Sequence, residues 1–252
     1  MNRFGTIISI GFATAGFAYM FNNDAIKSCI IGVFASIVFS FGVYIQSKAN
    51  YFWNKKFNKL LYYLSKNDKE YNVVSKEFTY TCINENQYKS EKKIIIYPTS
   101  DNVDRISERF AWSAHSANAM IKPLNATHEI KAIRQQELWT CYSVYFNHTC
   151  QKKREYETGS VIENLIDEKG EAVPFLSATV ERKTKILIMQ VKFENKKVSP
   201  IATFKVFTPK SMTKEIYSEE LKFDNVAKGF KCVVNYPRPN WKYVISWEHK
   251  KS

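Results

Sequence analysis

The 252-residue sequence lacks the short motifs that mark the common enzyme classes. It has no Gly-rich phosphate-binding loop, no G-x-S-x-G nucleophile motif, no H-E-x-x-H metal motif and no C-x-x-C pair. The four histidines lie at positions 115, 128, 148 and 249, without the spacing of metal ligands. We therefore expect a protein that is not an enzyme and that needs neither a metal nor a cofactor.

Cysteine and acidic residues are also scarce. The five cysteines, at positions 29, 82, 141, 150 and 232, are an odd number and suggest no disulfide framework. The 24 acidic residues are outnumbered by 37 Lys and Arg residues, which gives a net charge of +13. Such a charge suits a protein that meets an anionic lipid surface or an anionic ligand.

Charged residues are absent from two apolar runs near the N-terminus, residues 4–21 and 28–47. At about 1.5 Å per residue, each run as a helix would span about 27–30 Å, the thickness of a hydrocarbon core. The sequence therefore predicts a two-helix transmembrane hairpin over residues 1–47. A cleaved signal peptide is the alternative, because Arg3, an apolar stretch and Ala13-Thr14-Ala15 resemble one.

Basic residues after the second run set the orientation of the predicted hairpin. They are Lys48, Lys55, Lys56, Lys59 and Lys66. The positive-inside rule then places both termini in the cytoplasm. Residues 48–75 are predicted to form a basic amphipathic collar helix and a linker. Small residues at every fourth position of both apolar runs allow helix packing and a homo-oligomer.

Beyond residue 76 the pattern is typical of β-strands, since β-branched and aromatic residues alternate with polar ones. Strands are predicted at residues 78–83 and 92–97, and a short helix at residues 102–110. Eight further strand-like runs follow, at residues 138–146, 154–166, 172–182, 185–194, 200–208, 215–223, 229–236 and 241–249. Their even spacing predicts an antiparallel β-barrel of about eight strands, with its core at 138–249 in a domain at 76–252. A β-sandwich is the alternative to the barrel. The predicted fold class is thus membrane-anchored and mainly β.

Cations and aromatic rings fall on strands that we expect to be neighbours. A nucleotide-like anion needs cations for its phosphates and flat faces for its bases. The candidate ligand-binding residues are Trp139, Tyr142, Arg154, Tyr156, Thr179, Arg182 and Lys183. Taken singly, each is more often a core ring or a solvated turn, so the prediction depends on their clustering at the mouth of a barrel.

The order of these segments resembles the two-transmembrane β-barrel effectors of bacterial cyclic-oligonucleotide (CBASS-like) anti-phage signalling. The resemblance lies in architecture over the whole chain, with residues 4–47 as the anchor and 138–249 as the barrel; residues 78–137 are additional. It implies a lipocalin-like barrel that binds a cyclic nucleotide, assembly in the bacterial inner membrane and loss of membrane integrity. It assigns no ligand contact to any residue.

Two functional hypotheses follow. In the first, the chain is a membrane-anchored anti-phage effector whose partners are a cyclic oligonucleotide, the lipid bilayer and further copies of itself, with no DNA or RNA. In the second, it is a membrane-tethered β-sandwich that binds a protein partner and has no toxicity of its own.

Overall fold

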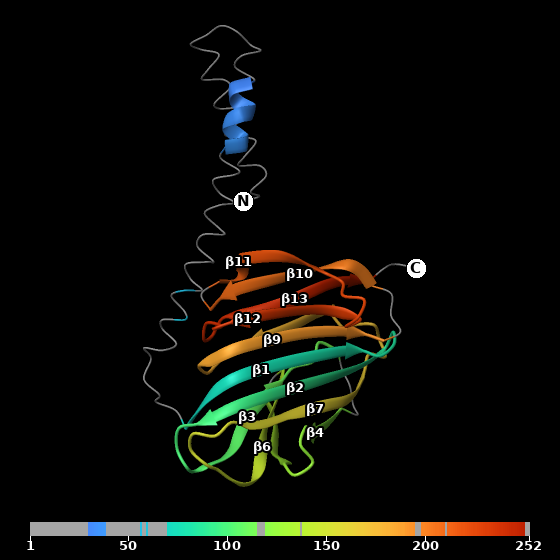
Figure 1. Ribbon diagram of the computed structural model, residues 1–252. Coiled ribbons are helices and arrows are strands. Elements are labelled where there is room, and N and C mark those ends of the chain that lie inside the picture. Colours follow the sequence, from blue (N-terminus) through green and yellow to red (C-terminus); the bar gives the residue numbers. More distant parts are fainter. Residues whose placement is uncertain are drawn as a thin grey trace. The chain divides into compact units, whose positions relative to one another are not determined.

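The computed structural model describes residues 30–38, 56, 59, 70–114, 119–136, 138–194, 198–209 and 211–249. They belong to two compact units, Met1–Lys56 and Phe57–Ser252. In the first unit, residues 30–38 form a helix. In the second unit, most of the described residues are in β-strands (Figure 1).

The prediction of a membrane anchor requires correction. Among the described residues, no helix is both long enough and apolar enough to cross a membrane. The nine helical residues that the structure describes here, 30–38, cover about 13 Å at 1.5 Å per residue, less than half of a hydrocarbon core. The two-span fold class and the inner-membrane localisation are therefore wrong for the structure described, because an uncharged run fixes neither the length nor the continuity of a helix. Residues 4–21, 28–29 and 39–47 of the predicted spans lie outside the described residues, as does the predicted collar apart from the helical Lys56 and Lys59.

Thirteen strands are described in the second unit. Their bounds are β1 (Tyr71–Cys82), β2 (Gln87–Pro98), β3 (Val103–Phe110), β4 (Met120–Pro123), β5 (Glu129–Gln136), β6 (Trp139–Cys150), β7 (Tyr156–Ile166), β8 (Phe175–Thr179), β9 (Thr184–Phe193), β10 (Val198–Thr208), β11 (Ser211–Lys222), β12 (Gly229–Asn235) and β13 (Lys242–His249). All eight strand-like runs expected after residue 138 are thus confirmed as strands.

The described strands form three sheets (Figure 1). Sheet A has six strands in the order β12-β9-β1-β2-β7-β4, sheet B has three in the order β3-β6-β5, and sheet C has four in the order β11-β10-β13-β8. The predicted eight-stranded barrel is therefore wrong, because the C-terminal strands are shared among three sheets that each end in two edge strands. The arrangement is closer to the sandwich alternative. One pairing, β1 with β9, is parallel, against the expected antiparallel meander.

Three smaller expectations also need correction. Residues 71–75, predicted as part of a linker, are the start of β1. Residues 102–110, predicted as a helix, contain β3. The strands β4 and β5, in the stretch called additional above, were not expected.

Sheet B covers one part of the inner face of sheet A. Tyr71 and Val73 of β1 and Ile94 and Ile96 of β2 pack with buried residues of β3 and β6, among them Ile106, Tyr142 and Val144. Full burial of side chains of this size stabilises the fold by roughly 1.5–3 kcal/mol each. This cluster is the core between sheets A and B.

Sheet C covers another part of the same face. The ring of Trp247, on β13, lies 6.0 Å from that of Tyr80 on β1 and 5.7 Å from that of Phe193 on β9. Since side chains alternate along a strand, Tyr88, Ser90, Lys92 and Ile94 of β2 share this inner face. The polar pair in the middle of that row, Ser90 and Lys92, lies in the gap between the two covering sheets and marks the position of the candidate site.

Candidate anion-binding pocket

A cavity of about 640 Å³ lies between sheets B and C, over the middle of sheet A. Its floor is formed by Lys76 and Phe78 of β1 and by Ser90 and Lys92 of β2. One wall is β3 with the segment after it, where residues 107–113 line the cavity consecutively; the opposite wall is β8, residues 175–179. Strand edges, rather than strand faces, therefore form these two walls.

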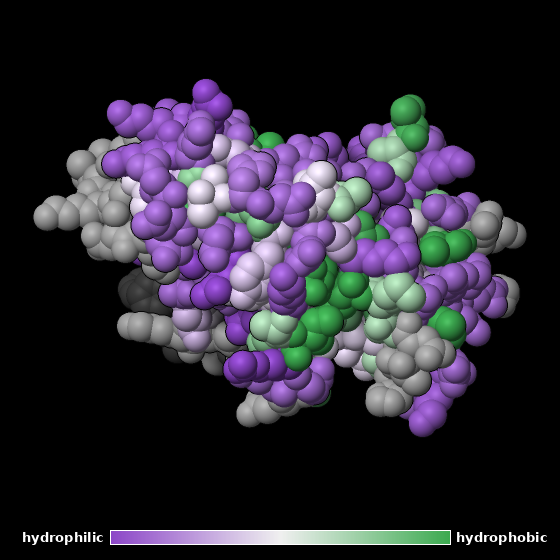
Figure 2. All heavy atoms as spheres, turned by 90° about the horizontal axis from the view of Figure 1, so that it is seen from below, coloured by the Kyte–Doolittle hydropathy of each residue, from purple (hydrophilic) through white to green (hydrophobic). Residues whose placement is uncertain are grey.

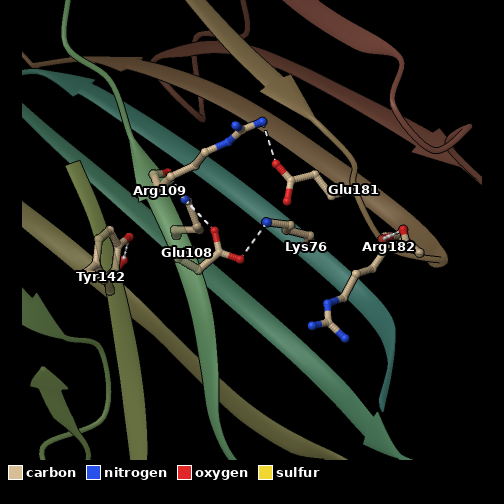
Figure 3. Close-up of polar contacts among 9 residues, drawn as sticks. Lys76, Glu108, Arg109, Tyr142, Glu181 and Arg182 are labelled. Carbon is tan, nitrogen blue, oxygen red and sulfur yellow. Dashed lines mark hydrogen bonds and ion pairs between the residues drawn. The ribbon is translucent and has the colours of Figure 1, made fainter. Parts of the chain in front are cut away.

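At the floor, two ammonium groups share one carboxylate (Figure 3). Lys76 Nζ and Lys92 Nζ each lie 2.7 Å from a different carboxylate oxygen of Glu108. Lys92 also donates a hydrogen bond to the backbone carbonyl of Arg109, at 2.9 Å. The exposed fraction of the side chain is 15% for Lys76, 8% for Lys92 and 11% for Glu108, so the three charged groups are well shielded from water.

Glu108 is held in its ionised form. Burial alone would raise the pKa of its carboxyl, but the charges of Lys76 and Lys92 and their hydrogen bonds outweigh burial and lower that pKa from 4.5 to about 2. One negative charge thus faces two positive charges, and the floor has an excess of one positive charge. A charge in a shielded place is costly unless it is paired, so this floor favours the approach of an anion.

Arg109 bridges the cavity from sheet B to sheet C. Its Nη2 lies 2.5 Å from Glu181 Oε1, just beyond the end of β8 (Figure 3). Its guanidinium also lies over the ring of Trp139, 4.5 Å from the ring centroid. The same geometry is found for Arg105, whose guanidinium lies 5.3 Å from the centroid of the Tyr145 ring. Strand β3 therefore presents two arginines, each stacked on an aromatic ring of β6.

The lining as a whole is positive. Among the described residues that line the cavity, five are cations and two are carboxylates: Lys76, Lys92, Arg105, Arg109 and Arg134 against Glu108 and Glu181. The excess of three positive charges favours anionic ligands over neutral or cationic ones.

An aromatic group closes the end of the cavity toward sheet C. The ring of Trp112 lies 5.3 Å from that of Tyr88 and 6.0 Å from that of Tyr80. The indole Nε1 of Trp112 is buried and has no hydrogen-bond partner among the described residues. It is a donor that a ligand carbonyl or phosphate oxygen could satisfy.

The structure brings three of the seven predicted site residues to this cavity: Trp139, Tyr142 and Thr179. Tyr142 is buried and its hydroxyl lies 2.6 Å from Ser160 Oγ. Arg182 lies beside the cavity, with its guanidinium 4.2 Å from the centroid of the Tyr71 ring.

The other three predicted residues do not line the cavity. Tyr156 lies on β7, and its hydroxyl accepts a hydrogen bond from the Gln151 backbone N–H at 2.8 Å. Arg154 is exposed in the turn before β7. Lys183 lies in the turn before β9, where burial lowers its pKa.

Sequence reasoning missed the floor group of Lys76, Lys92 and Glu108. A signal was present in the alternation of β2, because Lys92 falls on the same face of the strand as the core residues Tyr88, Ile94 and Ile96. Glu108 was hidden by the prediction of a helix at residues 102–110.

Figure 2 shows the molecule from below, with a mostly hydrophilic surface and hydrophobic residues gathered near its middle. Three large hydrophobic side chains are exposed on and beside the hairpin of β5 and β6: Ile133 of β5, Leu138 just before β6 and Trp139 at the start of β6. In the part of the chain that the structure describes, no group of three or more His, Cys, Asp or Glu residues could hold a metal ion. The expectation of a metal-free non-enzyme stays a prediction.

Comparisons with known proteins give only distant similarity. No protein-family profile and no curated protein matches the chain. Among solved structures, the M1 zinc metallopeptidase of Deinococcus radiodurans is similar, with a TM-score of 0.37 and 6% identity over 71% of this chain and 43% of that one. A proposed protease from Parabacteroides distasonis gives a TM-score of 0.39 and 7% identity over 73% of this chain and 36% of that one. The chain thus spans about two fifths of the length of these proteins, and at these scores neither similarity carries a functional argument.

Proposed function

We propose that the β-rich unit is a binding module for a small anionic ligand that carries a flat ring, with a cyclic nucleotide as the leading ligand class. The observation that carries this proposal is the floor of the cavity, where Lys76 and Lys92 share the single carboxylate of Glu108. The excess positive charge there has no counter-ion among the described residues that line the cavity.

Electrostatics gives this arrangement a useful magnitude. Two opposite unit charges about 4 Å apart attract by about 4 kcal/mol at an effective dielectric constant of about 20. A ligand anion beside the two lysines would gain an interaction of this order, reduced by the cost of its own desolvation. The cavity volume of about 640 Å³ is within the range of about 300–1,000 Å³ that is usual for small-molecule sites.

The aromatic lining supports the flat part of the ligand. Trp139 is partly exposed at the cavity, and Arg109 stacks on one of its faces. Any of the nucleobases can stack on an aromatic ring or on an arginine plane, and stacking on an aromatic ring contributes about 1–3 kcal/mol of binding free energy per base. A nucleotide would therefore find both of its recognition elements, cations and flat faces, in one cavity.

A thermal-shift and calorimetry experiment on the full chain tests this proposal. Cyclic mononucleotides and cyclic dinucleotides should raise the melting temperature, because a ligand that binds only the folded state stabilises it by mass action. Affinity should fall with added salt. Lys76→Gln removes the excess charge and should weaken binding, whereas Lys93→Gln should not, because Lys93 is an exposed partner of Glu157 on the opposite face of β2. Absence of binding by every nucleotide tested would contradict the proposal.

A second candidate function, binding of a protein partner, is favoured by the strand edges at the cavity. Among the described strands, β3 pairs only with β6 and β8 pairs only with β13, so each presents a free edge there. An extended acidic segment could add to either edge by backbone hydrogen bonds. Selection of displayed peptides on wild-type protein and on Lys76→Gln would test it, since enrichment of acidic peptides by the wild type alone would favour this function over nucleotide binding.

The wider anti-phage role, and the assembly of copies that ligand binding would favour, stay predictions. A ligand can drive assembly only if it binds the assembled state more tightly than the single chain. Light scattering with and without a bound nucleotide would measure this directly.

A further inference from the structure

This inference rests on the proposed function and concerns the kind of anion that the cavity floor accepts. We propose that Glu108 is a specificity-determining residue that limits the floor to an anionic group of one negative charge, such as a phosphodiester or a carboxylate. A group with two negative charges, such as a phosphomonoester near neutral pH, is disfavoured there.

The argument begins with the charge balance of the floor. Lys76 and Lys92 contribute two positive charges, and Glu108 lies 2.7 Å from both. One positive charge is left over, in a group whose side chains are at most 15% exposed. A single negative charge on the ligand makes this group neutral. A second negative charge would be shielded from water without a partner, which is unfavourable.

The remaining charges around the cavity do not alter this balance. Arg109 is already paired with Glu181, and both side chains are about half exposed. Arg105 donates a hydrogen bond to the Tyr145 hydroxyl and is exposed, and Arg134 is exposed on β5. Exposed charges are screened by salt, so they raise the affinity for anions in general without setting the charge at the floor.

Among the described residues, the groups that face Glu108 lie on β1, β2 and β6. Lys76 on β1 and Lys92 on β2 are its ion-pair partners. Tyr142 on β6 has its pKa raised, chiefly by burial, and Tyr71 on β1 has its pKa raised to about 12 for the same reason. Glu108 itself stays ionised between about pH 5 and pH 8, because its pKa is lowered to about 2, so its negative charge at the floor is constant over this range.

A matched pair of probes tests the inference by calorimetry on the full chain. Adenosine 3′,5′-cyclic monophosphate has one negative charge, and adenosine 5′-monophosphate has the same base and sugar with two. We expect the wild type to prefer the cyclic ester. Glu108→Gln raises the excess charge of the floor to two and should shift the affinity ratio toward the dianion by about tenfold or more, a change of about 1.4 kcal/mol.

Glu157→Gln is the control, because Glu157 is an exposed carboxylate 2.7 Å from Lys93 on the other face of sheet A. It should leave the ratio unchanged. An affinity ratio that is the same in Glu108→Gln and in the wild type would overturn the inference while leaving the proposed function intact. Failure of both probes to bind the wild type would contradict the proposed function and the inference together.

A second measurement needs no variant, in case Glu108→Gln does not fold. The second pKa of a phosphomonoester is about 6, so adenosine 5′-monophosphate becomes mostly a monoanion at pH 5.2. Its affinity for the wild type should rise severalfold between pH 7.5 and pH 5.2, whereas that of the cyclic ester should stay constant. If the affinities of the two probes changed with pH in the same way, the inference that the floor selects a group of one negative charge would be refuted.

Discussion

Arg109 and Glu181 connect two sheets that share no strand. Arg109 lies on β3 of sheet B, and Glu181 lies two residues after the end of β8 of sheet C. Their side chains form an ion pair at 2.5 Å. It crosses the cavity whose floor is the group of Lys76, Lys92 and Glu108. A ligand anion that enters would compete with Glu181 for the same guanidinium.

Replacement of Arg109 should therefore affect binding more than folding. In Arg109→Gln, the exposed ion pair is lost at a cost below about 1 kcal/mol in the free energy of unfolding. Nucleotide affinity should fall about tenfold or more, since a hydrogen bond to a charged group contributes about 1.5–3 kcal/mol. Lys122→Gln is the control, because Lys122 forms a similarly exposed pair with Glu163 at 2.7 Å. Unchanged affinity in Arg109→Gln would remove Arg109 from the binding site.

Acid should destabilise the fold through Glu108. Its pKa is lowered from 4.5 to about 2 on folding, so its contribution to stability is fully present above pH 4.5 and is lost as the pH falls from 4.5 to about 2. The shift corresponds to roughly 3 kcal/mol. Urea unfolding at pH 5 and at pH 2.5 measures this loss in the free energy of unfolding. The difference between the two pH values should be smaller for Glu108→Gln than for the wild type. A wild type with equal stability at both values would contradict the lowered pKa.

Gly159 is expected to be intolerant of any side chain. A Cβ at this position of β7 would lie 1.9 Å from the backbone carbonyl oxygen of Lys92, and its φ of +152° is rare for other residues. Gly159→Ala should lower the free energy of unfolding by more than about 2 kcal/mol, as measured by thermal melting. Gly170→Ala is the comparison, since its φ is +69° but no atom lies within 4 Å of the added Cβ. It should cost only the backbone strain of about 1–2 kcal/mol.

The buried hydroxyl pair of Tyr142 and Ser160 should show coupling in a double-mutant cycle. Tyr142→Phe leaves Ser160 Oγ without the partner that lies 2.6 Å away, and the cost should be about 1–3 kcal/mol. In the Ser160→Ala variant, Tyr142→Phe should lower the free energy of unfolding by about 1 kcal/mol less than it does in the wild type. Additive effects of the two substitutions would show that the contact does not stabilise the fold.

Strand positions followed from the sequence because they depend on local alternation. Most of the runs from residue 138 onward alternate with a period of two, and each contains a strand. The failure at residues 102–110 has a local cause: the pairing of β3 with β6 shifts between Val103 and Arg105. In the sequence, Val103, Ile106 and Phe110 are three and four residues apart, which is also the pattern of a helix face. The bulge allows residues at this spacing to face the same core from a strand.

The division into three sheets could not be predicted in this way. It depends on pairings between distant segments, such as Val73 of β1 with Thr184 of β9, which leave no local pattern. For the same reason, only part of the site could be predicted. Trp139 and Tyr142 lie on one predicted strand, whereas Lys76, Lys92 and Glu108 come together only because sheet B packs on sheet A.

The parallel pairing of β1 with β9 also sets an order of events during synthesis. β1 and β2 can form a hairpin as soon as both have left the ribosome, but the other edge of β1 stays unpaired until residues 184–193 emerge. Contacts this far apart in sequence slow folding, because a long loop must close before they form. A nascent or truncated chain that ends before β9 therefore carries an open, partly apolar strand edge, the kind of surface that chaperones bind and that otherwise leads to aggregation.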